Sequence, residues 1–263
     1  MVIYEPKGKA REYSPFACNL YLTCSHNCKY CYAPKTLKRD KNAYFTKQPE
    51  PRKNIIQKLA NELKKNAPTK QVLLSFIGDV YSESSDNNET TRKALELFLN
   101  YHVPVAILSK GGKRCLKDVD LFQEFGDHFQ FGSTLTFMEE NKSIEWENGS
   151  ALPEERLQVL KKLHNSGIKT FASFEPVIEP SESLQLIQET LHDDSVDTYK
   201  IGKINNFMDI DKTIDWRKFL EDCLFNLEGT GKNIYIKYDL RKAAGIQLED
   251  KYTDTDLYTV KGW

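Results

Sequence analysis

Short strand-like runs alternate with longer helical patterns along almost the whole chain, and this alternation limits the folds open to it. Six segments space apolar residues three and four positions apart, as amphipathic helices do, at 54–65, 89–102, 115–125, 153–167, 182–194 and 215–229. Seven runs rich in β-branched and aromatic residues lie around them, at 18–22, 71–76, 103–109, 129–137, 168–174, 196–202 and 233–238. Such alternation implies parallel strands joined by right-handed crossovers. It predicts an α/β fold, either a doubly wound sheet or an open or closed α/β barrel.

Length and composition are those of a single globular unit. The chain has 263 residues, of which 40% are hydrophobic and 29% charged, and it contains no repeat and no convincing linker. We therefore expect one domain over residues 1–263. Its apolar runs are too short to span a bilayer, and its first residues lack the apolar core and cleavage site of a secretory signal. These features predict a cytoplasmic protein that makes no membrane contact.

Three of the six cysteines crowd into eight residues, in the segment LTCSHNCKYCYAP directly after the first predicted strand. In a reducing compartment this crowding indicates metal binding. Cys24, Cys28 and Cys31 can converge on one inorganic cluster if the loop wraps around it, and a [4Fe–4S] cluster is normally held by cysteine thiolates. With only three thiolates, one iron is left without a protein ligand and can bind another molecule.

Zinc is the alternative metal for these cysteines. A tetrahedral zinc site would need His26 or Cys18 as its fourth ligand. The corresponding class of protein would be a zinc-stabilised nucleic-acid-binding protein without catalysis. However, no second Cys-x2-Cys or His-x3-His pair is present to complete a paired zinc motif.

The cysteine spacing, with Tyr30 before the third cysteine, resembles the signature of the radical S-adenosylmethionine superfamily. The resemblance implies that the open iron chelates the amino and carboxyl groups of the methionine part of S-adenosylmethionine. One electron, from a reductant such as flavodoxin or ferredoxin, then breaks a carbon–sulfur bond. The products are methionine and a 5′-deoxyadenosyl radical that abstracts a hydrogen atom from the substrate.

Four further segments are similar, in register and order, to the family of spore photoproduct lyase and its DNA-repair-photolyase-like relatives. They are ILSKGGKRCLKDVDLF, GSTLTF, PEERLQVLKKLHNSG and FASFEPVI, and the similarity spans about residues 14 to 205. It implies an incomplete (β/α)6-type barrel. Residues 206–263 would form an extension in which Lys237, Tyr238 and Arg241 close the mouth of the barrel, or which covers the barrel floor.

By this resemblance, residues that follow consecutive strands would bind S-adenosylmethionine. Asp79 stands where the superfamily carries the glutamate that meets the methionine amino group, and Lys110 would neutralise the carboxylate. The ribose and adenosyl parts would meet Ser133, Thr134 or Thr136, together with Ser173 and Glu175. Taken singly, each has a plain structural alternative as a turn residue, a solvated charge or a strand spacer. Their place at successive strand ends, where such folds build their sites, favours the binding role.

The lyase also needs a cysteine that donates a hydrogen atom, and Cys115 is the candidate because it follows a strand-end loop. The alternative for Cys115 is a structural thiol packed against apolar neighbours. Cys223 lies in the apolar stripe of a predicted helix, and Cys18 alternates with Leu20 and Leu22. We expect both of these cysteines to be core residues.

Positive charge is concentrated near the cysteines. Residues 1–70 contain 15 Lys or Arg and 5 Asp or Glu, whereas the remainder is acidic. The residues flanking the cysteines include the basic Lys29, Lys35, Lys38, Arg39 and Lys41, and the aromatic Tyr30, Tyr32 and Tyr44. This pattern favours a nucleic-acid or nucleotide-bearing substrate. Two alternatives stay open: the charges only offset the acidic remainder or the cluster, or the substrate is a peptide or a small metabolite.

Overall fold

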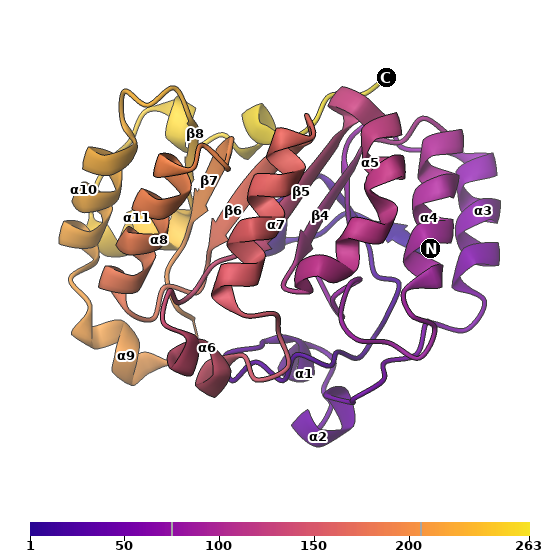
Figure 1. The fold of residues 1–263 in the computed structure, drawn as a ribbon, viewed down its shortest axis with the longest axis horizontal. Coiled ribbons are helices and arrows are strands. Elements are labelled where there is room, and N and C mark those ends of the chain that lie inside the picture. The colour runs from indigo at the N-terminus through magenta and orange to yellow at the C-terminus, as the bar shows by residue number, and fades with distance from the viewer. Residues whose placement is uncertain (75, 206) are drawn as a thin grey trace.

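The chain forms one mostly parallel sheet with helices packed along one face (Figure 1). A computed structural model describes residues 1–74, 76–205 and 207–263. Within these ranges the sheet has eight strands, which lie in the order of the sequence. They are β1 (Ile3–Tyr4), β2 (Phe16–Cys18), β3 (Val72–Leu74), β4 (Val105–Ser109), β5 (Phe129–Thr134), β6 (Lys169–Phe174), β7 (Thr198–Ile201) and β8 (Asn233–Ile236).

The pairing of the strands confirms the predicted incomplete barrel. β1 runs antiparallel to β2, and each later strand pairs in parallel with the one before it. β1 and β8 are the two edges of the sheet in the described residues, so the sheet is not closed. The parallel part has seven strands where the (β/α)6 pattern has six, because the run at 233–238 pairs beside β7 as β8.

The longer helices stand side by side along one face of the sheet (Figure 1). They are α3 (Ile55–Lys65), α4 (Glu89–Asn100), α5 (Val119–Phe125), α7 (Pro153–Asn165), α8 (Pro180–His192) and α10 (Trp216–Leu227), followed by the shorter α11 (Tyr238–Ala244). α7 shows why they pack there. Leu157, Leu160 and Leu163 are buried against the sheet, and full burial of one such side chain contributes roughly 2 kcal/mol. Pro153 begins this helix.

The short helices α1 (Ala33–Thr36), α2 (Lys41–Tyr44), α6 (Glu140–Trp146) and α9 (Met208–Thr213) lie together at one end of the molecule, at the bottom of Figure 1. α1 and α2 follow the cysteine loop, and α6 follows β5. The 3-10 turns are Gly8–Ala10, Gly112–Asp118, Gly126–His128, Asp250–Tyr252 and Thr255–Tyr258. The end that carries α1, α2 and α6 is the carboxyl end of the parallel strands, where folds of this kind build their sites.

The first parallel strand differs from the expectation for residues 18–22. β2 covers Phe16–Cys18, and the chain leaves the sheet at Asn19. The Asn19 side chain explains the early exit, because its Oδ1 accepts hydrogen bonds from the backbone N–H groups of Phe76 and Ile77. Beyond it, Tyr21 forms an isolated antiparallel bridge with Pro51. The cysteine loop therefore begins closer to the sheet than the sequence pattern indicates.

The C-terminal segment crosses the opposite, amino end of the strands. The Val260 N–H donates to Gln71 Oε1 at 2.9 Å, and the Tyr258 carbonyl accepts from Gln130 Nε2 at 3.3 Å. Of the three residues expected to close the mouth, Lys237 at the end of β8 lines the cavity described below, whereas Tyr238 and Arg241 are not among its lining residues. Among the described residues, no helix is long and apolar enough to cross a bilayer.

Candidate functional site

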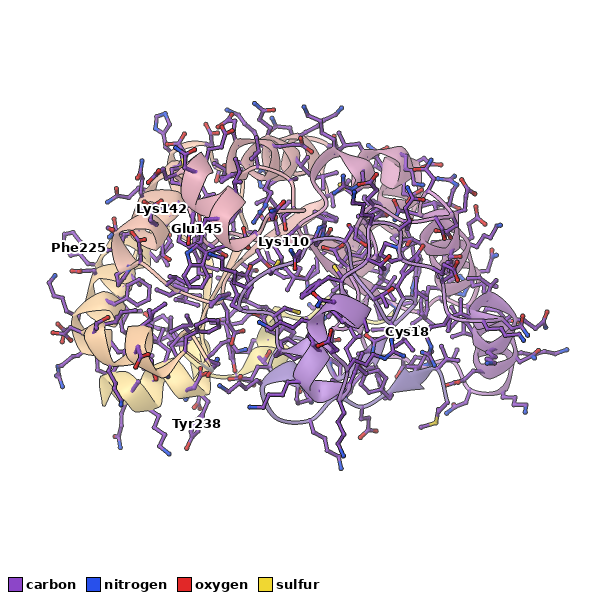
Figure 2. The ribbon with its side chains drawn as sticks, turned by 90° about the horizontal axis from the view of Figure 1, so that it is seen from below. Cys18, Lys110, Lys142, Glu145, Phe225 and Tyr238 are labelled. Atoms are coloured by element: carbon purple, nitrogen blue, oxygen red, sulfur yellow. The ribbon has the colours of Figure 1, made fainter. Side chains whose placement is uncertain are left out.

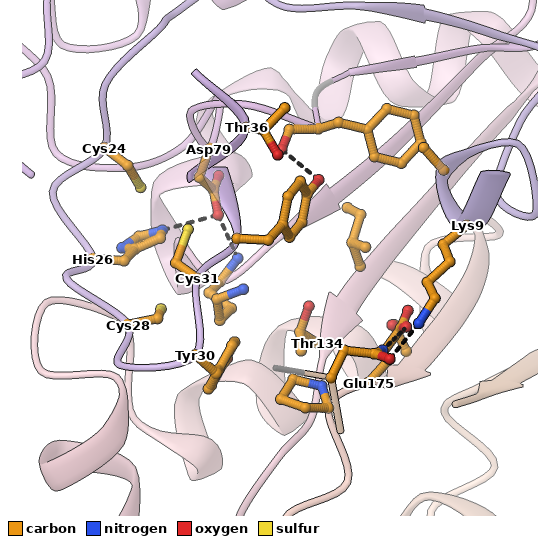
Figure 3. Close-up of a pocket in the computed structure, with 18 of the residues that line it drawn as sticks. Lys9, Cys24, His26, Cys28, Tyr30, Cys31, Thr36, Asp79, Thr134 and Glu175 are labelled. Atoms are coloured by element: carbon orange, nitrogen blue, oxygen red, sulfur yellow. Dashed lines mark hydrogen bonds and ion pairs between the residues drawn. The ribbon is translucent and has the colours of Figure 1, made fainter. Parts of the chain in front are cut away.

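A cavity of about 620 Å³ opens at the carboxyl ends of the parallel strands (Figure 3). Cysteine side chains line one end of it, and lysine and glutamate side chains line the other. Lys110 is one of its lining residues, and in the view from below it lies near the middle of the molecule (Figure 2). Predicted site residues in its wall are Cys24, Cys28, Tyr30, Cys31, Asp79, Lys110, Thr134, Ser173 and Glu175. The topology therefore brings together residues that are far apart in the sequence.

Neighbouring segments hold the cysteine loop from both sides. On one side, the Cys24 N–H donates to the Tyr44 carbonyl, and the Cys24 carbonyl accepts from the Thr46 N–H. On the other side, the Lys29 N–H donates to the Trp146 carbonyl at 2.8 Å. Gly149 lies so close that a Cβ added to it would be 2.2 Å from the Ser25 carbonyl oxygen. The path of the loop is thus fixed by backbone contacts to α2 and to the end of α6.

Burial of the cysteines favours a bound metal cluster. Cys24 and Cys28 are buried, and Cys31 is partly exposed to the cavity. Burial raises the pKa of Cys24 to about 11 and that of Cys28 to about 12. Thiolates at these positions need a metal to stabilise them, because a buried anion without a partner is costly. Three thiols at one end of a large cavity fit a cluster that has three protein ligands.

The two proposed fourth ligands of a zinc ion are both occupied elsewhere. His26 Nδ1 lies 3.0 Å from the Gly149 carbonyl, and its Nε2 lies 2.9 Å from Asp79 Oδ2, so neither ring nitrogen points at the thiols. Cys18 is fully buried in the hydrophobic core, where burial raises its pKa to about 12. Across the part of the chain that the structure describes, no three His, Cys, Asp or Glu side chains converge on a single metal ion.

Asp79 joins the cysteine loop to two strand ends. Its Oδ1 accepts from Ser109 Oγ and the Tyr81 N–H, and its Oδ2 accepts from the Lys110 N–H and faces His26. Burial by itself would raise the pKa of Asp79, but the charge and hydrogen bond of His26 outweigh burial and lower it. Four interactions fill the usual acceptor positions of a carboxylate. Asp79 therefore lines the cavity while holding the walls together.

Lys110 follows β4, and its side chain lies near Cys28 and the buried carboxylate of Glu147. Its ammonium group lies 5.9 Å from the centre of the Tyr30 ring. Burial would lower the pKa of Lys110, but the nearby Cys28, Glu147 and Asp79 raise it, so the side chain stays a cation. The structure thus provides one positive charge between the thiols and the rest of the cavity.

The Ser/Thr group after β5 divides into one residue at the cavity and two behind it. Thr134 lines the cavity (Figure 3). Ser133 is buried and donates to the Ser109 carbonyl, and Thr136 is buried and donates to Glu147 Oε1 at 3.2 Å. Neither Ser133 nor Thr136 is among the lining residues of the cavity, so of these three residues only Thr134 is placed to meet a ligand there.

The far end of the cavity is a network around Glu175. The Tyr13 hydroxyl lies 2.6 Å from Ser173 Oγ and donates to Glu175 Oε2 at 2.9 Å. Lys237 forms a 2.5 Å ion pair with the same carboxylate oxygen and lies 4.6 Å from the centre of the Tyr13 ring. Lys9, from the N-terminal turn, pairs with Asp239 at 2.6 Å. Sequence reasoning missed Tyr13 and Lys9, because no motif connects the N-terminus with β6.

Behind Tyr13, Lys200 is buried inside the barrel. Its ammonium group faces the rings of Tyr13, Phe171 and Tyr235 at 5.3 to 5.9 Å. Burial, assisted by the positive charge of Lys237, lowers the pKa of Lys200 to about 7.

Cys115 does not reach the cavity. It lies in the 3-10 turn Gly112–Asp118, fully buried in the hydrophobic core, and burial raises the pKa of its thiol. Its placement favours the alternative of a structural thiol, and its role as a hydrogen donor stays a prediction. Cys223 is likewise buried in the core, on α10.

A buried ion pair behind the cysteine end was also missed. Arg156 Nη2 lies 2.6 Å from Glu147 Oε2, and both side chains have 1% or less of their surface exposed. One signal was available in the sequence. Arg156 occupies the helical face that Leu160 and Leu163 continue, so a charged residue stood in an apolar stripe.

Comparison with known proteins identifies the class to which this fold and cavity belong. The family model described as the radical SAM superfamily matches residues 18–193, and the chain belongs to that superfamily of enzymes. Membership implies a [4Fe–4S] cluster and S-adenosylmethionine as cofactors.

An uncharacterized protein of Methanocaldococcus jannaschii is 28% identical over 163 residues, which are 62% of this chain and 60% of that protein. Among solved structures, Streptococcus suis SuiB bound to S-adenosylmethionine has a TM-score of 0.62 and 10% identity, over 89% of this chain and 53% of SuiB. Spore photoproduct lyase complexed with a dinucleoside spore photoproduct has a TM-score of 0.59 and 14% identity, over 86% of this chain and 64% of the lyase. The chain thus spans between half and two thirds of the length of these three proteins, and the two structural likenesses show the fold.

Proposed function

We propose that Cys24, Cys28 and Cys31 hold a [4Fe–4S] cluster at the cysteine-lined end of the cavity and that the chain acts on a nucleic acid or a nucleotide-bearing molecule. When bound and reduced, the cluster supplies the electron that cleaves S-adenosylmethionine into methionine and a 5′-deoxyadenosyl radical. The observation that carries the proposal is the grouping of three thiols at one end of a cavity whose other end carries polar and charged groups.

The residues of the cavity have separate tasks in this proposal. The Lys110 ammonium neutralises the methionine carboxylate, since it is a cation beside the thiols. Thr134, Ser173 and Glu175 offer hydroxyl and carboxylate groups to the ribose and adenine, farther along the same wall. Asp79 is assigned to the methionine amino group, which would have to replace one of the four interactions that its carboxylate now makes with Ser109, Tyr81, Lys110 and His26. The burial of Cys24 and Cys28 at the cysteine end limits the access of water to a reactive radical.

Exposed cations on the segment beside the cavity, called the rim below, support a polyanionic substrate. Lys35, Lys38 and Lys41 lie on or beside α1 and α2, are exposed, and form no ion pair with any of the described residues. Tyr32 lines the cavity with 46% of its surface exposed, which gives a base a ring on which to stack. Unpaired cations next to an exposed aromatic ring are typical of single-stranded nucleic-acid sites. The lyase of similar fold was solved with a dinucleoside.

A peptide substrate is the second candidate, because SuiB of similar fold was also solved bound to its precursor peptide. The free cations of the rim favour the nucleic acid over a peptide of unspecified charge. In either case the reaction needs a one-electron reductant, for which we propose a flavodoxin or a ferredoxin.

Anaerobic reconstitution tests the proposal. Protein loaded with iron and sulfide is incubated with S-adenosylmethionine and dithionite, and 5′-deoxyadenosine is measured by chromatography. We expect a brown protein that makes 5′-deoxyadenosine, and a Cys24→Ala variant that makes none. Deuterium transfer from labelled oligonucleotides, peptides or metabolites into 5′-deoxyadenosine then identifies the substrate class. A colourless protein that contains zinc and no iron would contradict the proposal and favour the non-catalytic alternative.

A further inference from the structure

The buried ion pair between Glu147 and Arg156 connects the segments that form the cysteine end of the cavity. Glu147 caps α6, and Arg156 lies in the first half of α7. Apart from the pair itself, Glu147 accepts hydrogen bonds from the hydroxyl groups of Tyr30, Thr136 and Ser143. Tyr30 lies between Cys28 and Cys31, so the carboxylate is bonded directly to the cysteine loop.

Arg156 makes the corresponding contacts to the strand ends. Its Nη1 donates to the Thr134 carbonyl at 3.0 Å, and its Nε donates to the Ala151 carbonyl at 2.7 Å. The Ala151 N–H in turn donates to the Lys110 carbonyl at 2.9 Å. The pair therefore holds the cysteine loop, the end of β5 and the segment after β4 in one arrangement. These are the segments that carry Tyr30, Thr134 and Lys110.

Both charges of the pair are buried in the protein interior, behind the cysteine end of the cavity. Burial by itself would lower the pKa of Arg156, but the charge and hydrogen bond of Glu147 raise it. Because the pair is shielded from water, neither charge is screened by solvent as a surface charge would be. Together they are neutral, and either one alone would be a full charge beside the thiols.

We propose that Glu147 is a positioning residue of this enzyme: it neutralises Arg156 and anchors Tyr30, so that the cluster loop is held in place without a net charge behind it. The inference rests on the proposed cluster at Cys24, Cys28 and Cys31. An electron added to the cluster makes it more negative. An uncompensated Arg156 therefore stabilises the reduced cluster and makes its reduction potential more positive.

The test is a redox titration of the reconstituted protein, followed by the electron paramagnetic resonance signal of the reduced cluster. Glu147→Gln keeps the shape of the side chain and leaves Arg156 charged, because a guanidinium does not lose its proton in proteins. We expect its potential to be more positive than that of the parent. The double variant Glu147→Gln/Arg156→Gln removes both charges, and we expect its potential to return close to the parent value.

Glu145→Gln is the matched control. This substitution also removes one negative charge at the end of α6, but Glu145 is exposed and pairs with the exposed Lys29. The reduction potential of the Glu145→Gln variant should therefore equal that of the parent. A Glu147→Gln protein that binds its cluster at the parent potential would overturn the inference. A double variant whose reduction potential is shifted as far as that of the single variant would overturn the inference as well.

Folding is the second readout, because removing one partner of a buried pair is more damaging than removing both. If Glu147→Gln yields no folded protein, recovery of folding and of the parent potential in the double variant supports the pair. Failure of both variants to fold would instead overturn it, since shape and not charge balance would then be essential. A parent protein that binds no iron would refute the proposed function itself, before any variant is compared.

Discussion

His26 Nε2 lies 2.9 Å from Asp79 Oδ2, which ties the middle of the cysteine loop to the segment after β3. The same carboxylate accepts from the Lys110 N–H, so one side chain links the proposed cluster loop to two strand ends. A change at Asp79 should therefore disturb both the loop and the S-adenosylmethionine site, whereas a change at the Lys110 side chain should disturb only the latter.

Lys110→Ala should weaken the binding of S-adenosylmethionine without loss of iron. A charge-assisted hydrogen bond contributes about 1.5 to 3 kcal/mol, which corresponds to roughly a ten- to hundredfold loss of affinity. Asp79→Ala should show a similar loss of affinity together with a lower melting temperature. Equilibrium binding and iron analysis on the same samples check both outcomes. Unchanged binding in both variants would leave the proposed S-adenosylmethionine site without its charged contacts.

Substitution of Cys24, Cys28 or Cys31 by alanine should abolish formation of 5′-deoxyadenosine, because the described residues offer no replacement thiol or free imidazole at this end of the cavity. Cys18→Ala is the control and should keep activity, since Cys18 packs in the core behind the sheet. Iron content and product formation are measured for each variant. Parent activity in any one of the three cysteine variants would refute the ligand assignment.

Gly149→Ala should loosen the cysteine loop. The added Cβ would lie 2.2 Å from the Ser25 carbonyl, so backbone must move, at a cost of about 1 to 3 kcal/mol. We expect reduced iron retention on dilution into a chelator, measured by absorbance. Asn148→Ala changes the exposed neighbouring side chain and should retain iron as the parent does. Equal retention in the glycine variant would mean that the loop tolerates displacement.

Binding of single-stranded nucleic acid should weaken steeply with salt. Each phosphate neutralised lowers log K by about 0.7 per log unit of salt. The variant Lys35/Lys38/Arg39→Ala should reduce that slope by about 2 to 3 phosphate equivalents, if each cation meets one phosphate. The control Lys58/Lys64/Lys65→Ala removes as much charge from α3, far from α1 and α2 (Figure 1). An identical slope in both variants would favour a peptide or metabolite substrate.

Lys200 should make the protein more stable as the pH rises above neutrality. Burial lowers the pKa of Lys200 to about 7 in the folded state, whereas the unfolded side chain has its ordinary value of 10.5. Between these values the unfolded chain binds the extra proton, so the free energy of unfolding contributed by this group increases with pH. From pH 7 to pH 9 the gain is on the order of 2 kcal/mol.

Lys200→Met should remove this gain, which urea unfolding of parent and variant at both pH values would measure. The difference between the two proteins isolates Lys200 from every other titrating group. If the free energy of unfolding changes equally with pH in the parent and the variant, Lys200 stays a cation in the folded protein over this pH range.

The amino-acid sequence by itself determined the alternation of strands and helices and the three-cysteine loop at the end of the first parallel strand. Both depend on local spacing: apolar residues at helical or strand periods select the elements, and three nearby thiols need no distant partner to suggest a cluster. The right-handed crossover rule then orders the strands. The seven strand-like runs became the seven parallel strands, whereas the resemblance to a (β/α)6-type barrel implied six, and the opening of the sheet was implied by that resemblance alone.

Only the tertiary structure decided which polar residues meet. The side chain of Asn19 ended the first parallel strand earlier than its apolar pattern predicts, and the folding of α6 and α7 around Glu147 and Arg156 placed an ion pair behind Tyr30. The burial of Cys115 likewise depends on how its turn packs against neighbouring helices. Asn19 and Phe76, like Tyr30 and Glu147, lie more than fifty positions apart in the sequence, and the energies of all these contacts depend on desolvation. Desolvation is a property of the packed interior that no local sequence pattern contains.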